Sequence, residues 1–255
     1  YIVTSYCNEG SLEALLKKRT RLTEAEALTI VRQIAEAMQG LSELDLRNEQ
    51  GEKLAILHRD IKPANLLLHD GEIRIADFGF SKLIEDSKKG KRLTHTQLGT
   101  PSYMSPEILT GSEYSFKCDV WATGIVLYQM LFGRRPWEGS MSHNLYENIL
   151  DNPLEFPRPV KYEVRELIKA MLTQDEQERI DWKGVLEHPA IVGKGPDVKI
   201  LQEVEKKETE KKESKIERAD KEVKQPEKVD GSVKKDPEMA DSAPKRVRKK
   251  ITFIE

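Results

Sequence analysis

A segment near the C-terminus of this 255-residue chain has a composition that cannot support a folded core. From Lys199 to Lys250, 52 residues include 17 Lys+Arg and 13 Asp+Glu but no aromatic residue. A segment with so little apolar surface cannot offset the entropy lost on folding. The rest of the chain holds 25 Lys+Arg and 31 Asp+Glu. We therefore expect an acidic globular body of one or two domains, followed by a basic tail.

The longest apolar run of the body is too short for a transmembrane helix. It extends from Val120 to Phe132 and is interrupted by Thr123, Gly124 and Gln129. A hydrocarbon layer of about 30 Å requires roughly 20 apolar residues in a helix. We therefore expect no membrane-spanning segment and no membrane partner.

The cysteines and the N-terminus indicate the compartment. Cys7 and Cys118 are too few for a disulfide framework and too far apart for zinc-site spacing. The chain opens on Tyr1 without the basic start and apolar run of a signal peptide. We expect an intracellular, cytoplasmic protein, and a chain that begins inside a longer sequence.

Apolar residues spaced three and four apart predict a long amphipathic helix. They are Leu28, Val31, Ile34, Ala35, Met38 and Leu41. Thr23 and Glu26 precede them with the spacing of a capping box, in which both side chains bond to free backbone amides. We predict a helix over residues 23–44.

A short hairpin is predicted next. Leu66-Leu67-Leu68 leads into His69-Asp70-Gly71, after which Ile73 and Ile75 alternate with polar residues. Asp-Gly is a favoured two-residue hairpin turn because it tolerates positive φ at both positions. We predict two short strands around this turn.

Further helices are predicted after the hairpin. Pro106 suits a first helical position, and the apolar run that follows Asp119 ends before Gly133. Apolar spacing predicts two more helices, over 164–172 and 182–186. The predicted fold class is mainly α with small β hairpins.

Two polar segments flank the predicted hairpin. His58-Arg59-Asp60-Ile61-Lys62-Pro63-Ala64-Asn65 precedes it and Asp77-Phe78-Gly79 follows it, so Asp60, Asn65 and Asp77 fall at one end of the two strands. Mg²⁺ prefers carboxylate and amide oxygens, together with waters and phosphate oxygens. Asn65 and Asp77 are therefore the candidate magnesium ligands, and Lys62 adds a compensating positive charge.

These two segments resemble the catalytic loop and the Asp-Phe-Gly motif of eukaryotic serine/threonine protein kinases. Residues 99–107 are similar to the end of a kinase activation segment, and Asp119-Val120-Trp121 to the start of the central helix of the large lobe. The resemblance covers roughly residues 1–192. Residues 77–82 and 98–101 are similar to the Unc-51-like subfamily.

The resemblance implies an enzyme that transfers the γ-phosphate of ATP to Ser/Thr hydroxyls of protein substrates, with Mg²⁺ as a cofactor. It implies that Asp60 orients the substrate hydroxyl and accepts its proton, and that Lys62 stabilises the transferred phosphoryl group. Thr100 would brace both side chains. Asn65 and Asp77 would hold the metal ions.

The resemblance also assigns the nucleotide base and the regulation. Thr4, Tyr6, Cys7 and Leu67 match positions around the adenine, although a lone cysteine is more often an inert small hydrophobe. Arg59 matches the residue that pairs with a phosphate on the activation segment. Thr94 and Thr96 are the candidate acceptors of that phosphate.

Other matched positions have structural roles. The resemblance implies that Glu107 and Arg179 form a buried ion pair that holds the large lobe together. It implies that Asp119 bonds to the backbone of the catalytic loop while also capping its own helix. We expect His58 to be a packed structural histidine rather than a base.

The resemblance implies three parts. Residues 1–12 match the last small-lobe strand and the hinge, 13–195 match the large lobe, and 196–255 form a charged tail that is largely disordered or marginally helical. We expect a protein-kinase-like C-terminal lobe that lacks most of the N-terminal lobe, because the 255 residues contain no glycine-rich phosphate loop. We expect this chain alone to be nearly inactive. The alternative is a non-catalytic pseudokinase or scaffold that binds protein partners.

Two further features of the sequence bear on substrate and partner preferences. Ser11 and Ala64 match positions where many kinases carry the acidic side chains that select upstream arginine, so we expect no such demand. The basic cluster Lys245–Lys250 suits nuclear import or an anionic partner, but a charge run is more often simply solvated. Partner binding through the tail stays open, and nucleic acid is not expected.

Overall fold

The computed structural model describes residues 5–51, 53–85, 100–139 and 142–192. The predictions for Thr4, Thr94, Thr96 and the tail 196–255 fall outside these residues. The chain divides into two units, Tyr1–Thr209 and Glu210–Glu255, and all the described residues belong to the first.

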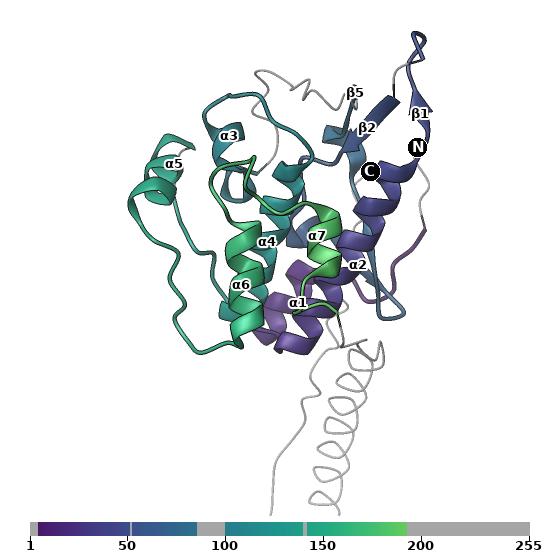
Figure 1. The fold of residues 1–255 in the computed structure, drawn as a ribbon. Coiled ribbons are helices and arrows are strands. Elements are labelled where there is room, and N and C mark those ends of the chain that lie inside the picture. The colour runs from purple at the N-terminus through teal and green to yellow at the C-terminus, as the bar shows by residue number, and fades with distance from the viewer. Residues whose placement is uncertain (1–4, 52, 86–99, 140–141, 193–255) are drawn as a thin grey trace, which may run out of the picture. The chain divides into compact units, whose positions relative to one another are not determined.

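The described part of the first unit contains seven α-helices and two small antiparallel sheets (Figure 1). The helices are α1 (Leu12–Arg19), α2 (Glu24–Glu43), α3 (Pro106–Leu109), α4 (Lys117–Phe132), α5 (Ser142–Asp151), α6 (Tyr162–Met171) and α7 (Trp182–Glu187). The strands are β1 (Leu46–Arg47), β2 (Lys53–Leu57), β3 (Leu66–His69), β4 (Glu72–Ile75) and β5 (Lys82–Glu85). The predicted class, mainly α with small β elements, is confirmed for these residues.

The predicted capping box begins α2. The Thr23 amide donates to the Glu26 carboxylate at 2.8 Å, and the Glu26 amide donates to the Thr23 hydroxyl at 3.3 Å. Two otherwise unsatisfied donors of the first turn are thereby bonded. The helix then buries its apolar stripe against α4 and α7.

The predicted hairpin is also present. Strands β3 and β4 pair antiparallel, with Leu66 opposite Ile75 and His69 opposite Glu72. Asp70 and Gly71 form the turn with φ of 53° and 79°. Positive φ at both positions is the requirement of this turn type, which explains the Asp-Gly sequence.

Helix α4 lies at the centre of the core, in contact with α2 and α6 (Figure 1). Its side chains are buried on nearly all sides, including Trp121, which has no exposed surface. Gly124 permits the close approach of α6, because a Cβ there would lie 3.0 Å from Cβ of Met171, the last residue of that helix. No helix among the described residues is long and apolar enough to cross a bilayer.

Three features were not predicted. Helices α1 and α5, which each bury only two side chains, were not predicted. The sheet β1–β2–β5 was also missed, because β2 pairs with a strand more than 20 residues further along, Ala55 lying opposite Ile84. This sheet ends where the polar segment 58–65 begins.

Candidate active site

The segment 58–65 connects β2 to β3 and starts with a buried histidine. His58 has no exposed surface. Its Nδ1 accepts from the Asp60 amide at 3.3 Å, so Nε2 carries the proton and faces the Ala76 carbonyl at 3.0 Å. His58 thus ties the loop to the end of β4, and it is a packed structural residue, as predicted.

Asp119 holds the start of the loop from the first turn of α4. Its two carboxylate oxygens accept from the amides of His58 and Arg59, both at 2.8 Å. Burial raises the pKa of the Asp119 carboxyl, and these two amide hydrogen bonds act in the opposite direction. Arg59 has a φ of 65°, which is strained for a non-glycine residue, and the two bonds fix that conformation.

One part of the prediction for Asp119 was wrong. The N-cap of α4 is Phe116, and its side chain makes no capping hydrogen bond. Asp119 lies three residues further along, so its carboxylate points to the loop and does not cap the helix. The capping interpretation failed because the helix begins one turn earlier than the apolar run.

Asp60 lies at the centre of a polar cluster. The Lys62 ammonium is 2.8 Å from Oδ2 of Asp60, and the Asn65 amide donates to the same oxygen at 2.9 Å. Thr100 donates to Oδ1 from its amide and from its hydroxyl, both at 3.3 Å. Lys62 also donates to the Thr100 hydroxyl at 2.9 Å. The structure therefore joins Asp60, Lys62, Asn65 and Thr100 through direct contacts.

The oxygen atoms of Asn65 and Asp77 suit a hard cation. Both N–H groups of the Asn65 side chain donate to Asp60, one to its carboxylate and one to its carbonyl. No described group donates to Oδ1 of Asn65, so this oxygen stays open for a ligand. Asp77 is exposed at the end of β4, and the adjacent Ala76 amide donates to the Asn65 carbonyl at 2.9 Å. One amide and one carboxylate oxygen thus fit Mg²⁺ bound with phosphate oxygens and waters.

No group of three or more His, Cys, Asp or Glu side chains that could bind a metal occurs in the described ranges. A cation held by Asn65 and Asp77 would complete its coordination with waters and phosphate oxygens.

Arg59 directly precedes Asp60 of the polar cluster. Its guanidinium donates to the Tyr114 hydroxyl at 3.3 Å, and Tyr114 is buried. Tyr114 was missed in the sequence because nothing in its local pattern indicates a partner 55 residues away. The proposed phosphate acceptors, Thr94 and Thr96, fall outside the described residues.

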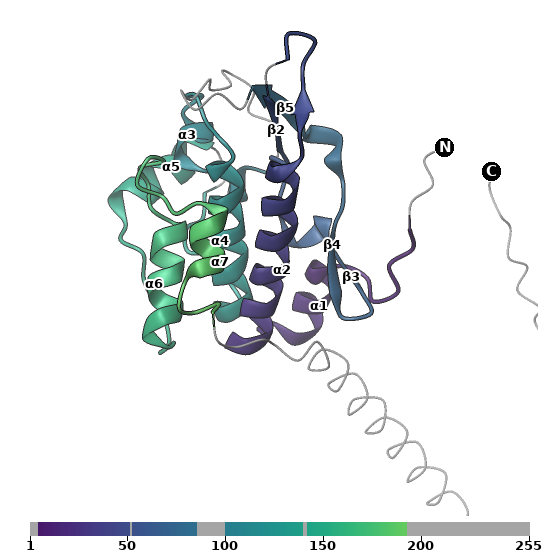
Figure 2. The same ribbon diagram turned by 45° about the vertical axis from the view of Figure 1, so that its right-hand side comes forward.

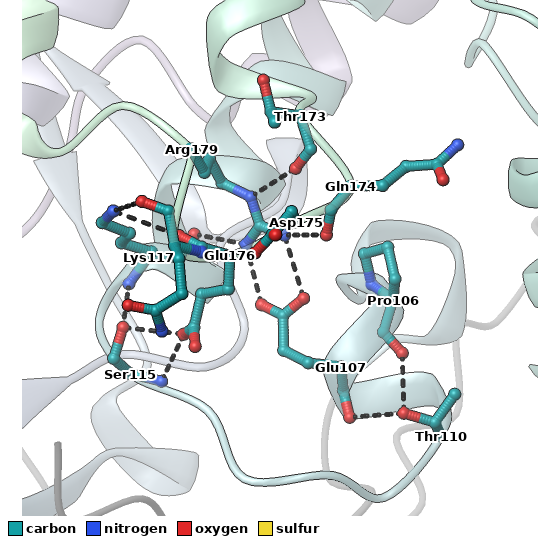
Figure 3. A network of polar contacts seen from close by, with 11 residues as sticks. Pro106, Glu107, Thr110, Ser115, Lys117, Thr173, Gln174, Asp175, Glu176 and Arg179 are labelled. Carbon is teal, nitrogen blue, oxygen red and sulfur yellow. Dashed lines mark hydrogen bonds and ion pairs between the residues drawn. The ribbon is translucent and has the colours of Figure 1, made fainter.

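Glu107, in α3, and Arg179 form a two-point ion pair (Figure 3). The two terminal nitrogens of Arg179 donate to the two carboxylate oxygens at 2.7 and 2.9 Å. The guanidinium carbon also lies 5.0 Å from the ring centroid of Trp121. The predicted pair is therefore present, linking α3 to the segment before α7.

A second set of contacts in the same network was not predicted. Glu176 accepts from the Ser115 amide and hydroxyl at 2.6 and 2.7 Å, while Lys117 donates to the carbonyls of Glu176 and Gln177 at 3.1 and 2.9 Å (Figure 3). The start of α4 and the segment 176–177 thus bind each other reciprocally. Their sequence separation, about 60 residues, hides the relationship from local patterns.

The structure describes part of the segment expected to hold adenine. Tyr6 is 82% exposed, and Cys7 and Leu67 are half-buried. Ser11 forms an isolated antiparallel bridge with Leu67, which places this segment beside β3. Among the described residues, no hydrogen bond joins Tyr6 or Cys7 to Leu67, and Thr4 lies outside these residues.

Comparison with known proteins identifies relatives of this chain. Residues 1–191 match the family described as the protein kinase domain. An Aurora kinase of Eremothecium gossypii is 37% identical over 192 residues, which cover 75% of this chain and 48% of that protein. The serine/threonine-protein kinase atg1 of Dictyostelium discoideum is 32% identical over 192 residues, which cover 74% of this chain and 27% of that protein.

A third relative, the probable serine/threonine protein kinase IRE4 of Arabidopsis thaliana, is 31% identical over 224 residues, or 76% of this chain and 20% of that protein. The chain therefore spans less than half the length of each of these three proteins. Their identities are close to one another, so they single out no subfamily.

Proposed function

The chain belongs to the eukaryotic serine/threonine protein kinases through its protein kinase domain, and on this premise we propose that it carries a site for phosphate transfer from ATP to Ser/Thr hydroxyls of proteins. The main support for the proposal is that the side chains of Asp60, Lys62 and Thr100 contact one another directly. A carboxylate, an ammonium and a hydroxyl in direct contact provide a proton acceptor and a charge stabiliser at one place.

Asp60 would orient the attacking hydroxyl and accept its proton. Its Oδ2 is already bound by Lys62 and Asn65 at 2.8 and 2.9 Å, whereas the bonds from Thr100 to Oδ1 are 3.3 Å long. The more weakly bound Oδ1 is the oxygen that a substrate hydroxyl can reach with the smaller loss of existing contacts.

Lys62 would stabilise charge on the transferred phosphoryl group. Its ammonium is half-buried and positioned by both Asp60 and Thr100. A preorganised cation of this kind costs no reorganisation during the reaction. Asn65 and Asp77 would hold Mg²⁺, which when bound neutralises charge on the phosphate oxygens.

We propose further that residues 13–195 form the large lobe of the kinase fold and that the chain 1–255 alone transfers phosphate slowly. The 255 residues contain no Gly-x-Gly-x-x-Gly sequence to cover the phosphates. Loss of even one preorganised donor can reduce a rate by about 10²–10³. The alternative, a scaffold without catalysis, has no observation in its favour, since a scaffold does not require the Asp60 cluster.

The test compares phosphate transfer from ATP to Ser/Thr peptides by the chain 1–255 and its Asp60→Asn and Asp77→Asn variants. We expect each variant to lose about 100-fold or more of the wild-type rate. Asp151→Asn is the matched control, because Asp151 is exposed at the end of α5. Measurable transfer that is equal in all four proteins would overturn the proposal. Calorimetry with ATP and Mg²⁺ adds a second readout, in which Asp77→Asn should bind more weakly.

A further inference from the structure

The side chain of Asn8 binds the turn of the β3–β4 hairpin through three hydrogen bonds. Its Nδ2 donates to the Asp70 carboxylate at 2.8 Å. Its Oδ1 accepts from the Asp70 amide at 3.3 Å and from Nδ1 of His69 at 3.0 Å. We call these contacts between Asn8 and residues 69–70 the hinge clamp. Asn8 thus satisfies both the side chain and the amide of a turn residue held at positive φ.

Backbone contacts extend from the hinge clamp along β3. The Glu9 amide donates to the Leu68 carbonyl at 3.2 Å, and the Leu68 amide donates to the Gly10 carbonyl at 2.8 Å. Figure 2 shows the segment that precedes α1 beside the β3–β4 hairpin. This segment therefore pairs with β3 on the side opposite to β4, and its register depends on contacts at the turn.

The other end of the same hairpin carries the candidate magnesium ligands. Asn65 directly precedes β3, and Asp77 is the second residue after β4. The Ala76 amide donates to the Asn65 carbonyl, which continues the ladder to that end. Strand β3 therefore connects two parts of the candidate site. Its end at the turn positions the segment before α1, and its start positions the candidate metal ligands. A register shift of one residue would reverse the faces of all paired side chains.

We propose that Asn8 is a positioning residue for the nucleotide. By fixing the register of residues 5–11 against β3, the hinge clamp sets the separation between the backbone expected to hold the base and the oxygens of Asn65 and Asp77. This inference rests on the proposed function. Without the clamp, the nucleotide would have to order the segment itself on binding, and its apparent affinity would fall.

A charge-exchange experiment isolates the contact. Asn8→Asp places two carboxylates face to face across the 2.8 Å contact with Asp70. In Asp70→Asn alone, two side-chain carboxamides face each other, and one can still donate a hydrogen bond to the other. The double variant Asn8→Asp with Asp70→Asn restores the hydrogen bond between the two side chains with donor and acceptor exchanged, while an oxygen of the side chain at position 8 still accepts from the amide of residue 70 and from His69. Asn144→Asp adds the same charge at an exposed position of α5 and is the matched control.

The measured quantity is the Kd of ATP with Mg²⁺ for the chain 1–255. We expect Asn8→Asp to weaken binding about tenfold, the equivalent of one lost hydrogen bond, and the double variant to restore it. The melting temperature should barely change because Asn8 is exposed, whereas amide exchange at Glu9 and Leu68 should accelerate in Asn8→Asp only.

The outcomes separate this inference from the proposed function. If the wild type binds ATP and Asn8→Asp binds equally well, Asn8 is not a positioning residue and the proposed function stands. Weaker binding in Asn8→Asp that the double variant does not restore would also overturn the hinge clamp. If the wild type itself binds no ATP, both the function and the inference fail.

Discussion

Arg179 donates from both of its terminal nitrogens to both carboxylate oxygens of Glu107, although the two residues lie 72 positions apart. The guanidinium uses its other donors on the backbone carbonyls of Lys117, Thr173 and Gln174. All the hydrogen-bonding groups of this buried cation are therefore engaged, and three separate segments of the chain depend on it.

Removal of Arg179 should destabilise the body strongly. Arg179→Ala leaves the Glu107 carboxylate and three carbonyls without their donor, and such a loss from a buried pair costs about 3–5 kcal/mol. We expect that decrease in the free energy of unfolding, measured by urea titration. The control is Arg74→Ala, because the Arg74–Glu72 pair is more than half exposed and should contribute less than about 1 kcal/mol. Equal stability of both variants would contradict the role of Arg179.

Asp119→Asn should disturb the loop 58–65 despite its small change in shape. The carboxylate accepts from two amides, whereas a carboxamide can accept through one atom only and presents N–H groups to the other amide. One buried amide then loses its acceptor, at a cost of about 1–3 kcal/mol. We expect that loss by urea titration, together with shifted amide resonances for His58 and Arg59. Unchanged resonances would show that the loop holds its conformation without Asp119.

The parts of the fold that the sequence predicted correctly depend on neighbouring residues. The capping box at Thr23 and the Asp70-Gly71 turn each require contacts within four residues, so their patterns are visible locally. The pairing of β2 with β5 depends instead on a contact between distant segments. Short strands with no alternating pattern of their own form only because the partner strand is present.

The same distinction applies to the site. Asp60, Lys62 and Asn65 lie within one segment, and their order could be recognised. Thr100 joins them from 40 residues away, and only the family resemblance indicated it. Asn8 carried no signal at all, because an exposed asparagine is ordinary until its partner 62 residues further along is known.

The pH dependence of stability should report on Glu26. Burial raises the pKa of Glu26, but hydrogen bonds from Arg19 and Thr23 outweigh it and hold the pKa below its usual 4.5. Between the folded-state pKa and pH 4.5, the unfolded chain therefore binds more protons at Glu26 than the folded chain does. The contribution of Glu26 to stability is full above pH 4.5 and is lost as the pH falls through the folded-state pKa.

We therefore expect the difference in unfolding free energy between wild type and Glu26→Gln to be largest at neutral pH and to shrink below pH 4.5. Urea titrations across this range measure it. Glu36→Gln is the control, because Glu36 is exposed and its nearest cation, Arg32, lies 3.6 Å away. A difference that stays constant with pH would assign the effect of Glu26 to packing instead of charge.

Thr100 should contribute to phosphate transfer through its hydroxyl. Thr100→Val keeps the shape but removes the contacts to Lys62 and Asp60, whereas Thr100→Ser keeps the hydroxyl. Hydrogen bonds to charged groups contribute about 1.5–3 kcal/mol, which corresponds to a rate loss of roughly tenfold or more in the valine variant. Rates at saturating ATP measure the effect. Equal rates for the serine and valine variants would show that the hydroxyl is not used.

Substrate selection should show no demand for arginine upstream of the phosphorylated residue. The Ser11 hydroxyl accepts from the Ala14 amide and caps α1, and Ala64 lies one residue from Asn65 with no charge to offer. A peptide library phosphorylated by the chain should therefore show no enrichment of upstream arginine. The variant Ala64→Glu introduces a carboxylate next to Asn65 and should create that preference, because an arginine side chain can then form an ion pair there. Strong arginine selection by the wild type would mean that other acidic residues supply the contact.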